Sequence, residues 1–271
     1  MKRSFHALLA LAALASPLAA EEKPAPKPLF EPAHRSEMID CVRVRTGYTL
    51  SAMHIEADAT YTHTKIEDLR HEDIDLTGDT FYVSGALGIA DWLTAKATLP
   101  IHRRDFTPGG VEYGIGDIEM EAKLSFKAGL SPLGFVPVVD VCGGILFGLP
   151  TGDEDKGLGM ENLYVKPYAS ASFWFLPWLG VHGWGYFEFM EGDRPYHGGS
   201  AVVELVPFSR DLSLYGGGEY RQQGFDSPEV VFLPGIEYRV VPMVSVGLGA
   251  PVGISHRAED WSVILNLQVS F

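Results

Sequence analysis

The sequence predicts an all-β chain that closes into a transmembrane antiparallel β-barrel of about twelve strands. Three observations favour this fold. From Gly47 onward, stretches of roughly ten residues alternate between apolar and polar side chains, as barrel strands do. The breaks between them alternate between short, partly apolar connections and longer polar ones. The chain also ends on such a stretch, "WSVILNLQVSF", whose last residue is Phe271.

The first twenty residues have the pattern of a secretory signal peptide. Lys2 and Arg3 precede an apolar run from Ala7 to Ala15, and small residues follow before Glu21. The run is far shorter than the ~20 residues that a membrane-spanning helix needs. We therefore assign residues 1–20 to a signal peptide and expect export.

Residues 21–45 form a Pro-rich N-terminal segment that begins "EEKPAPKPLFEP", and prolines favour extended, poorly paired backbone. We expect this segment to be a periplasmic tether or a short luminal plug, and residues 46–271 to be the outer-membrane barrel. Removal of the signal peptide leaves 19 of the 21 basic residues against 35 acidic ones. This acidic balance argues against nucleic acid as a partner.

The alternating stretches give the expected strands in order. Each has apolar side chains at every second position, which is the pattern of a strand with one face in lipid. An even strand number also suits a barrel whose two ends lie on the same side of the membrane. The expected strands are Tyr48 to Tyr61 with a bulge near Met53, Phe81 to Ile89, Leu93 to Ile101, Ile118 to Ala128, Val139 to Phe147, Leu163 to Phe175, Val181 to Phe189, Ala201 to Pro207, Leu212 to Tyr220, Val230 to Val240, Val244 to Ile254, and Trp261 to Phe271.

The connections separate into two kinds. Short ones such as "IADW", "FLPWLG" and "VVPMV" take turns with long polar ones such as "HRRDFTPGGVEY", "GLPTGDEDKGLGMEN" and "MEGDRPYHGG". Tight periplasmic turns and long extracellular loops show this asymmetry in bacterial outer-membrane barrels. We therefore expect a Gram-negative outer-membrane location, with lipid and the barrel-assembly machinery as partners.

Closure of the barrel explains the ending on Phe271. An unpaired backbone amide in lipid costs several kcal/mol, so the last strand must pair with the first. Phe271 then faces outward at the periplasmic rim, where aromatic girdles lie. Trp92 and Trp178 fall in short turns and Trp261 at the far end of its strand, which places all three at predicted interfaces.

The opposite parity of the strands predicts the lining of the lumen, because lipid-facing and lumen-facing positions alternate. The set carries charges of both signs, so it is either a network of paired charges that fills a narrow barrel or the lining of a water-filled path. Trp184 and Tyr186 either stack on an aromatic or sugar ligand or simply fill the lumen. The candidates are Glu119, Glu121, Lys123, Asp140, Tyr164, Lys166, Tyr168, His182, Trp184, Tyr186, Glu219, Arg221, Glu237 and Arg239.

The two cysteines, Cys41 and Cys142, form a possible disulfide in an oxidising compartment. The alternation from Val139 to Phe147 places Cys142 inside the barrel, and Cys41 lies a few residues before the first expected strand. A bridge requires residues 30–45 to fold back into the lumen. The alternative is that the two thiols stay apart.

The sequence matches no enzyme signature in full, and we expect no catalysis. "GGSAV" around Ser200 lacks the second glycine of a nucleophile elbow. "GLPTGDEDKGLG" fails the calcium-loop pattern, and His63, His71 and His102 have no zinc-type spacing. No cofactor or metal is implied, and a hydrolase would need a serine and a histidine to converge near the rim.

Two segments resemble a known family. "YGIGDIEMEAKLSF" from Tyr113 and "GLPTGDEDKGLG" from Gly148 are similar to a Gly-x-Gly-Asp…Lys strand start and a Leu-Pro-Thr-Gly-Asp loop entry. Both occur in the outer-membrane family named for the meta-pathway of phenol degradation, whose members are regarded as transporters. The resemblance implies a barrel whose motif residues shape the rim, with Asp117 or Asp153 capping loop amides. The matching residues are Gly114, Gly116, Asp117, Lys123, Pro150, Thr151, Gly152 and Asp153.

Taken together, these features predict an outer-membrane channel for passive uptake of a small solute, with hydrophobic or aromatic compounds as candidates. The N-terminal segment would narrow the lumen. The alternative is a barrel that does not transport, whose lumen is sealed by paired charges and whose acidic loops form a surface for interaction. The solute and the oligomeric state stay open.

Overall fold

The computed structural model describes residues 38–46, 48–67, 74–127, 138–224, 226–256 and 258–271. The signal peptide and most of the Pro-rich segment lie outside these residues. Within them, no helix is long and apolar enough to cross a membrane.

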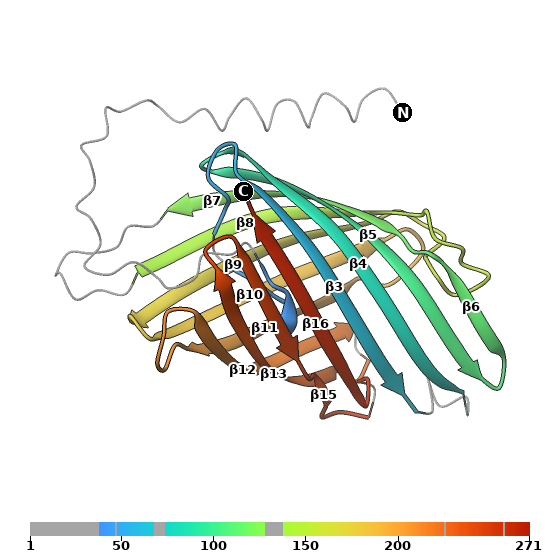
Figure 1. The fold of residues 1–271 in the computed structure, drawn as a ribbon. Coiled ribbons are helices and arrows are strands. Elements are labelled where there is room, and N and C mark those ends of the chain that lie inside the picture. The colour runs from blue at the N-terminus through green and yellow to red at the C-terminus, as the bar shows by residue number, and fades with distance from the viewer. Residues whose placement is uncertain (1–37, 47, 68–73, 128–137, 225, 257) are drawn as a thin grey trace, which may run out of the picture. The chain divides into compact units, whose positions relative to one another are not determined.

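The described residues confirm a closed antiparallel barrel of twelve spans (Figure 1). Two spans are interrupted. One consists of β6 and β7, with a break at Gly116 and Asp117, and the other consists of β14 and β15, with a break at Ala250 and Pro251. The strands are β3 (Ile55–Ile66), β4 (Asp75–Ala90), β5 (Leu93–Thr107), β6 (Gly110–Ile115), β7 (Ile118–Lys127), β8 (Val138–Leu149), β9 (Tyr164–Leu176), β10 (Leu179–Met190), β11 (Tyr196–Leu205), β12 (Leu212–Gln223), β13 (Glu229–Val241), β14 (Val244–Gly249), β15 (Val252–Gly253) and β16 (Trp261–Ser270).

The barrel closes between its first and last strands. β16 pairs with β3 over ten residues, from Trp261 opposite Lys65 to Ser270 opposite Glu56. Phe271 extends this ladder, because its amide donates to Ile55 O at 2.8 Å and its carbonyl accepts from Ile55 N at 3.1 Å. No edge is left between the two chain ends of the ring.

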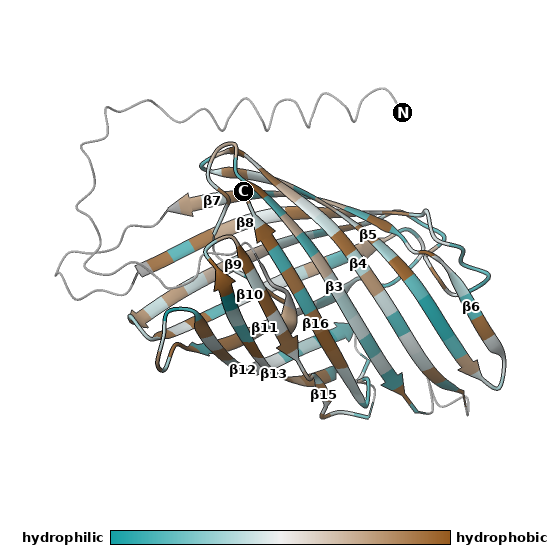
Figure 2. Ribbon diagram, viewed as in Figure 1, coloured by the Kyte–Doolittle hydropathy of each residue, from teal (hydrophilic) through white to brown (hydrophobic). Residues whose placement is uncertain are grey.

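Side chains alternate strictly between the two faces of the wall. On β16, Leu265 and Leu267 are exposed on the outside, while Asn266 and Gln268 are buried inside. The same alternation appears as bands of opposite hydropathy along the strands in Figure 2. Ile264, the residue that breaks the polar parity in the sequence, points inward and is buried.

The two ends of the barrel differ in the connections between strands. The turn end carries the short connections and both Ile55 and Phe271, and the loop end carries the connection from β8 to β9. Trp92 and Trp178 lie exposed at the turn end, and Trp261 lies half exposed where β16 starts at the loop end.

Several expected strand boundaries were wrong. The first strand begins at Ile55, not Tyr48, because Met53 has a left-handed backbone (φ 63°) and residues 48–54 pair irregularly. The eighth strand begins five residues early, at Tyr196, and the eleventh is interrupted instead of running from Val244 to Ile254.

The largest correction concerns "HRRDFTPGGVEY", which we expected to be a long loop. It continues the ladder as the outer parts of β5 and β6, with a turn at Pro108 and Gly109. Outward-facing ion pairs replace apolar side chains here: Asp79 lies 2.7 Å from His63 Nδ1 and 3.0 Å from Arg103 Nη1. The strands therefore keep pairing beyond the apolar part of the outer face.

The lipid exposure of β16 can be tested with Leu265→Arg. We expect this change to lower the free energy of folding into lipid by roughly 2–4 kcal/mol, because an exposed outward position near mid-strand would carry a charge into hydrocarbon. Leu265→Met is the matched control. Equal stability of the two variants in refolding titrations with lipid vesicles would show that this face is not in lipid.

The closure at Phe271 gives a second prediction. Deleting Phe271 removes two main-chain hydrogen bonds to Ile55, whereas Phe271→Ala keeps them and removes only the exposed ring. We expect the deletion to reduce the heat-modifiable, assembled fraction in outer membranes more than the alanine variant does. If both variants assemble like the unaltered chain, the terminal residue has no role in closure.

Candidate functional site

A short N-terminal hairpin lies inside the barrel. β1 (Met38–Ile39), the 3-10 turn η1 (Asp40–Val42) and β2 (Val44–Arg45) form it, with Ile39 paired to Val44. We call residues 38–46 the luminal segment. Figure 1 shows it as the blue element within the ring of strands, and it contacts β10, β11, β13, β14 and β16.

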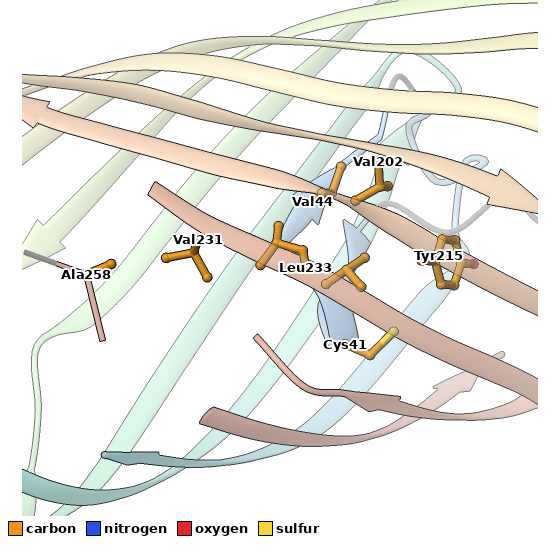
Figure 3. Close-up of a cluster of buried hydrophobic side chains, with 8 residues drawn as sticks. Cys41, Val44, Val202, Tyr215, Val231, Leu233 and Ala258 are labelled. Carbon is orange, nitrogen blue, oxygen red and sulfur yellow. The ribbon is translucent and has the colours of Figure 1, made fainter. Parts of the chain in front are cut away.

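Apolar packing fixes one side of the luminal segment to the wall (Figure 3). Cys41, Val42 and Val44 are almost fully buried against residues of β11, β12 and β13, including Val202 and Leu233. Burial of a valine side chain contributes about 1.5–3 kcal/mol. The segment is therefore held as part of the core.

Gly249 allows the segment to lie against β14. A Cβ atom at Gly249 would overlap the main-chain oxygen of Cys41, and one at Gly247 would lie 3.0 Å from Cys41 Cβ. Backbone approaches backbone at this point because the wall has no side chain there.

Arg43 forms the tip of the hairpin and points toward the loop end. Its backbone is left-handed (φ 54°), which is costly for a residue with a side chain. The guanidinium is held by Glu259 at 2.6 Å, by Ser262 at 2.9 Å and more distantly by Glu219 at 3.7 Å. These contacts offset the strain at the tip.

Arg45 lies deeper and is buried. Its guanidinium bonds to the Glu121 carboxylate and lies over two rings, with Cζ 5.0 Å from the Tyr168 centroid and 5.1 Å from the Trp184 centroid. The Tyr168 hydroxyl also donates to Glu121. One carboxylate and two aromatic faces thus surround one cation.

From Arg45 the chain descends to the turn end along the inner wall. Ser170 Oγ donates to Thr46 O at 2.7 Å, Trp174 Nε1 donates to Tyr48 OH at 2.5 Å, and Leu50 N donates to Thr94 Oγ1 at 2.8 Å. The N-terminal chain is therefore bonded to the wall from the middle of the barrel to its turn end.

Two cavities lie toward the two ends of the barrel and share no lining residue. The loop-end cavity has a volume of about 750 Å³ and includes Arg43 and Glu259 in its lining. The turn-end cavity, of about 330 Å³, includes Tyr48 and Asp140. The loop-end cavity is acidic, with six carboxylate residues against two arginines and His256.

The predicted lining residues of β7, β9 and β10 lie on the inner face and contact one another. Glu119 accepts from the Tyr164 hydroxyl, and Lys166 bonds to Glu188 at 2.8 Å. Lys123 is fully buried. Tyr186 stacks on Trp184 with centroids 4.6 Å apart.

The remaining predicted lining residues lie on β8, β12 and β13. Asp140 lines the turn-end cavity, and Glu219 and Arg221 line the loop-end cavity. Glu237 is buried and accepts from Tyr215 OH at 3.4 Å, whereas Arg239 is only half-buried. The structure therefore spreads these residues over both cavities and does not gather them into one site.

The motif residue Asp117 organises the connection from β8 to β9. Its Oδ1 accepts from the amides of Thr151 (3.1 Å) and Gly152 (3.0 Å), and its Oδ2 accepts from the amide of Met160 (2.7 Å). Thr151 Oγ1 donates to Gly116 O at 2.9 Å. One carboxylate thus ties both ends of the loop to the start of β7.

The loop folds inward over β5 and β6. Leu158 is buried, and a Cβ at Gly114 would lie 2.7 Å from Leu158 Cδ1. Asp153 is exposed and bonds to Lys156 at 2.8 Å, and this hydrogen bond lowers the pKa of the Asp153 carboxyl. Pro150 is exposed where β8 ends.

The possible disulfide was wrong: both cysteines lie in the described part of the chain, and no disulfide joins them. Cys41 packs against β13 and β14, whereas Cys142 lies on β8. Four strands, β9 to β12, separate these walls around the ring. A disulfide needs Cα atoms within about 7 Å, so the luminal segment enters the lumen without bringing the sulfurs together.

Ser172, His182 and Glu204 converge inside the barrel, with His182 2.8 Å from Ser172 Oγ and 2.7 Å from Glu204 Oε2. All three are almost fully buried, and the ring of Trp174 packs on His182. They lie near the turn end, within four residues of where β9 ends, β10 begins and β11 ends, and their burial closes them off from solvent. Among the described residues, no group of His, Cys, Asp or Glu is arranged to hold a metal ion.

Sequence reasoning missed the partners that the N-terminal segment supplies. Arg43 and Arg45 alternate with Val42 and Val44, which is a signal for a short strand that we did not use. It also missed the buried pair of Asp58 and Lys96, which lie 3.3 Å apart. The same alternation rule applied to β3 and β5 would have placed both inside.

Comparisons with known proteins show the fold. An outer membrane channel from Pseudomonas putida F1 has a TM-score of 0.68 and 14% identity over 83% of this chain and 97% of that one. The KdgM porin has a TM-score of 0.52 and 12% identity, covering 79% of this chain and 99% of that one. No family model and no curated protein matches, so the resemblance to the phenol meta-pathway family stays a prediction.

The role of Asp117 leads to a test of the loop. We expect Asp117→Ala to speed amide exchange at Gly152 and Met160 by roughly tenfold or more, because charge-assisted hydrogen bonds contribute about 1.5–3 kcal/mol each. Asp153→Ala is the control, because it removes the exposed pair with Lys156 and hydrogen bonds from the amides of Asp155 and Lys156 but no contact to Gly152 or Met160. Hydrogen exchange measured by mass spectrometry should distinguish the two, and unchanged protection in Asp117→Ala would contradict the capping role.

Proposed function

We propose that this chain is an outer-membrane channel for passive passage of a small solute, and that the luminal segment holds it closed at rest. The single observation that carries the proposal is the division of the lumen. A polar cavity lies at each end of the barrel, one lined in part by Arg43 of the luminal segment and the other by Tyr48 to Ser51 of the chain that follows it, and the two cavities share no lining residue.

The dimensions of the barrel support this reading. Eight-stranded barrels have interiors that side chains fill, whereas barrels of 16–18 strands leave an aqueous channel. Twelve strands lie between these cases, and part of the interior is here occupied by residues 38–46. Removal of this segment would open the space that Arg43 and Arg45 now occupy.

The inner wall supports the expected solute class. The rings of Tyr168, Trp184 and Tyr186 lie on the inner wall and would contact a hydrophobic or aromatic solute, while charged residues surround them. A flat solute with polar groups fits both features. The similarity to channels and porins supports passage in general, and the inner rings support the shape of the solute.

The rival function is a barrel that does not transport. The buried charge pairs, such as Lys166 with Glu188, favour a sealed interior. The two functions differ in what happens when the luminal segment leaves: a channel opens, whereas a sealed barrel stays closed or unfolds.

Gly249→Leu tests the proposal, because its side chain would overlap Cys41 and expel the luminal segment without removing any charge. We expect single-channel conductance in planar bilayers to rise severalfold above that of the unaltered protein. Gly85→Leu is the matched control, since a Cβ at Gly85 meets nothing within 4 Å.

Deletion of residues 38–46 provides a second route to the same state. Heat-modifiability on gels must show that each variant is a folded barrel. If folded Gly249→Leu and the deletion both conduct no more than Gly85→Leu, the channel proposal is wrong and the sealed barrel is favoured.

A further inference from the structure

Residues of the barrel strands line the pocket around Arg45, whereas Arg45 itself comes from the luminal segment. Glu121 lies on β7, Tyr168 on β9 and Trp184 on β10, whereas Arg45 belongs to the luminal segment. Tyr168 and Trp184 meet edge-to-face, with centroids 5.7 Å apart and an interplanar angle of 86°. Tyr168 contacts both Glu121 and Trp184 directly, so Arg45 does not bridge these three residues.

We propose that Glu121, Tyr168 and Trp184 form a binding site for the guanidinium group of an organic cation, and that Arg45 fills this site at rest. The inference rests on the proposed channel function, because in the unaltered protein a solute enters the site only when Arg45 leaves it. A guanidinium solute would then compete with Arg45, and its binding would favour the open lumen.

The chemistry of the walls selects guanidinium over ammonium. Planar guanidinium bonds to a carboxylate and stacks on aromatic faces, and it is more weakly hydrated than an ammonium. The two rings add a cation–π contribution, and indole is the best ring for it.

The loop-end cavity and the inner wall provide a route to the site. The cavity is acidic, which concentrates cations at its mouth. Two further rings on the inner wall each contact a cation. Arg221 Cζ lies 4.4 Å from the Tyr196 centroid, and Lys166 Nζ lies 4.9 Å from the Tyr186 centroid. Tyr186 stacks on Trp184, so the rings form a row that ends at the Arg45 pocket.

Arginine amide and lysine amide are matched probes, because they carry the same charge and differ in guanidinium against ammonium. We expect Arg45→Ala in detergent to bind arginine amide roughly tenfold more tightly than lysine amide, as measured by calorimetry. The unaltered protein should bind arginine amide more weakly than Arg45→Ala, because Arg45 occupies the site.

Two double variants test the walls. Adding Glu121→Gln or Trp184→Leu to Arg45→Ala should abolish the preference for arginine amide, whereas adding Trp261→Leu, at the loop-end start of β16, should leave it unchanged. Gly249→Leu, which vacates the site by expelling the segment, replaces Arg45→Ala if the latter does not fold.

The outcomes separate this inference from the channel proposal, because binding is measured without current. If folded Arg45→Ala or Gly249→Leu shows no preference for arginine amide, or keeps it after Trp184→Leu, the guanidinium site is wrong even where conductance rises. Binding with the predicted preference in a barrel that never conducts would support the site and overturn the channel.

Discussion

Pairing of every backbone amide within the wall is the constraint on which this structure depends. Lipid offers no hydrogen-bonding partner, so a sheet in a membrane must close on itself. β16 meets β3 in full register, and the last residue still pairs through Ile55. Closure fixes which side chains face inward, and it therefore turns an alternating sequence into an enclosed polar interior.

That interior must satisfy its own charges, and the luminal segment takes part in this. Arg43 and Arg45 bring two cations to carboxylates of the wall, Glu259 and Glu121. Loss of one partner from a buried ion pair is strongly destabilising, at about 3–5 kcal/mol, because the other charge stays in a poorly hydrated place. The segment and the wall thus stabilise each other, and contacts without charge, such as the packing of Val44 and the hydrogen bond from Ser170 to Thr46 O, also hold the segment.

The sequence was sufficient for the number of spans and for the faces of the strands, because alternation is a local property that each strand carries by itself. Leu265 and Asn266 fall on opposite faces as their order requires. The hairpin beyond the apolar band was missed because ion pairs such as Arg103 with Asp79 do not look like lipid-facing alternation. The course of residues 38–46, and hence the separation of Cys41 from Cys142, depends on contacts between distant parts of the chain, which no local pattern encodes.

The position of the luminal segment in the chain has a consequence for the order of folding. Arg43 precedes every wall strand in synthesis, yet its partner Glu259 lies 216 residues later, just before the strand that completes the ring. Contacts of such long sequence range form slowly, because much of the chain must be ordered before they contribute. The segment is made before the wall and enclosed last, so its contact with Glu259 can form only when the final part of the chain has joined the ring.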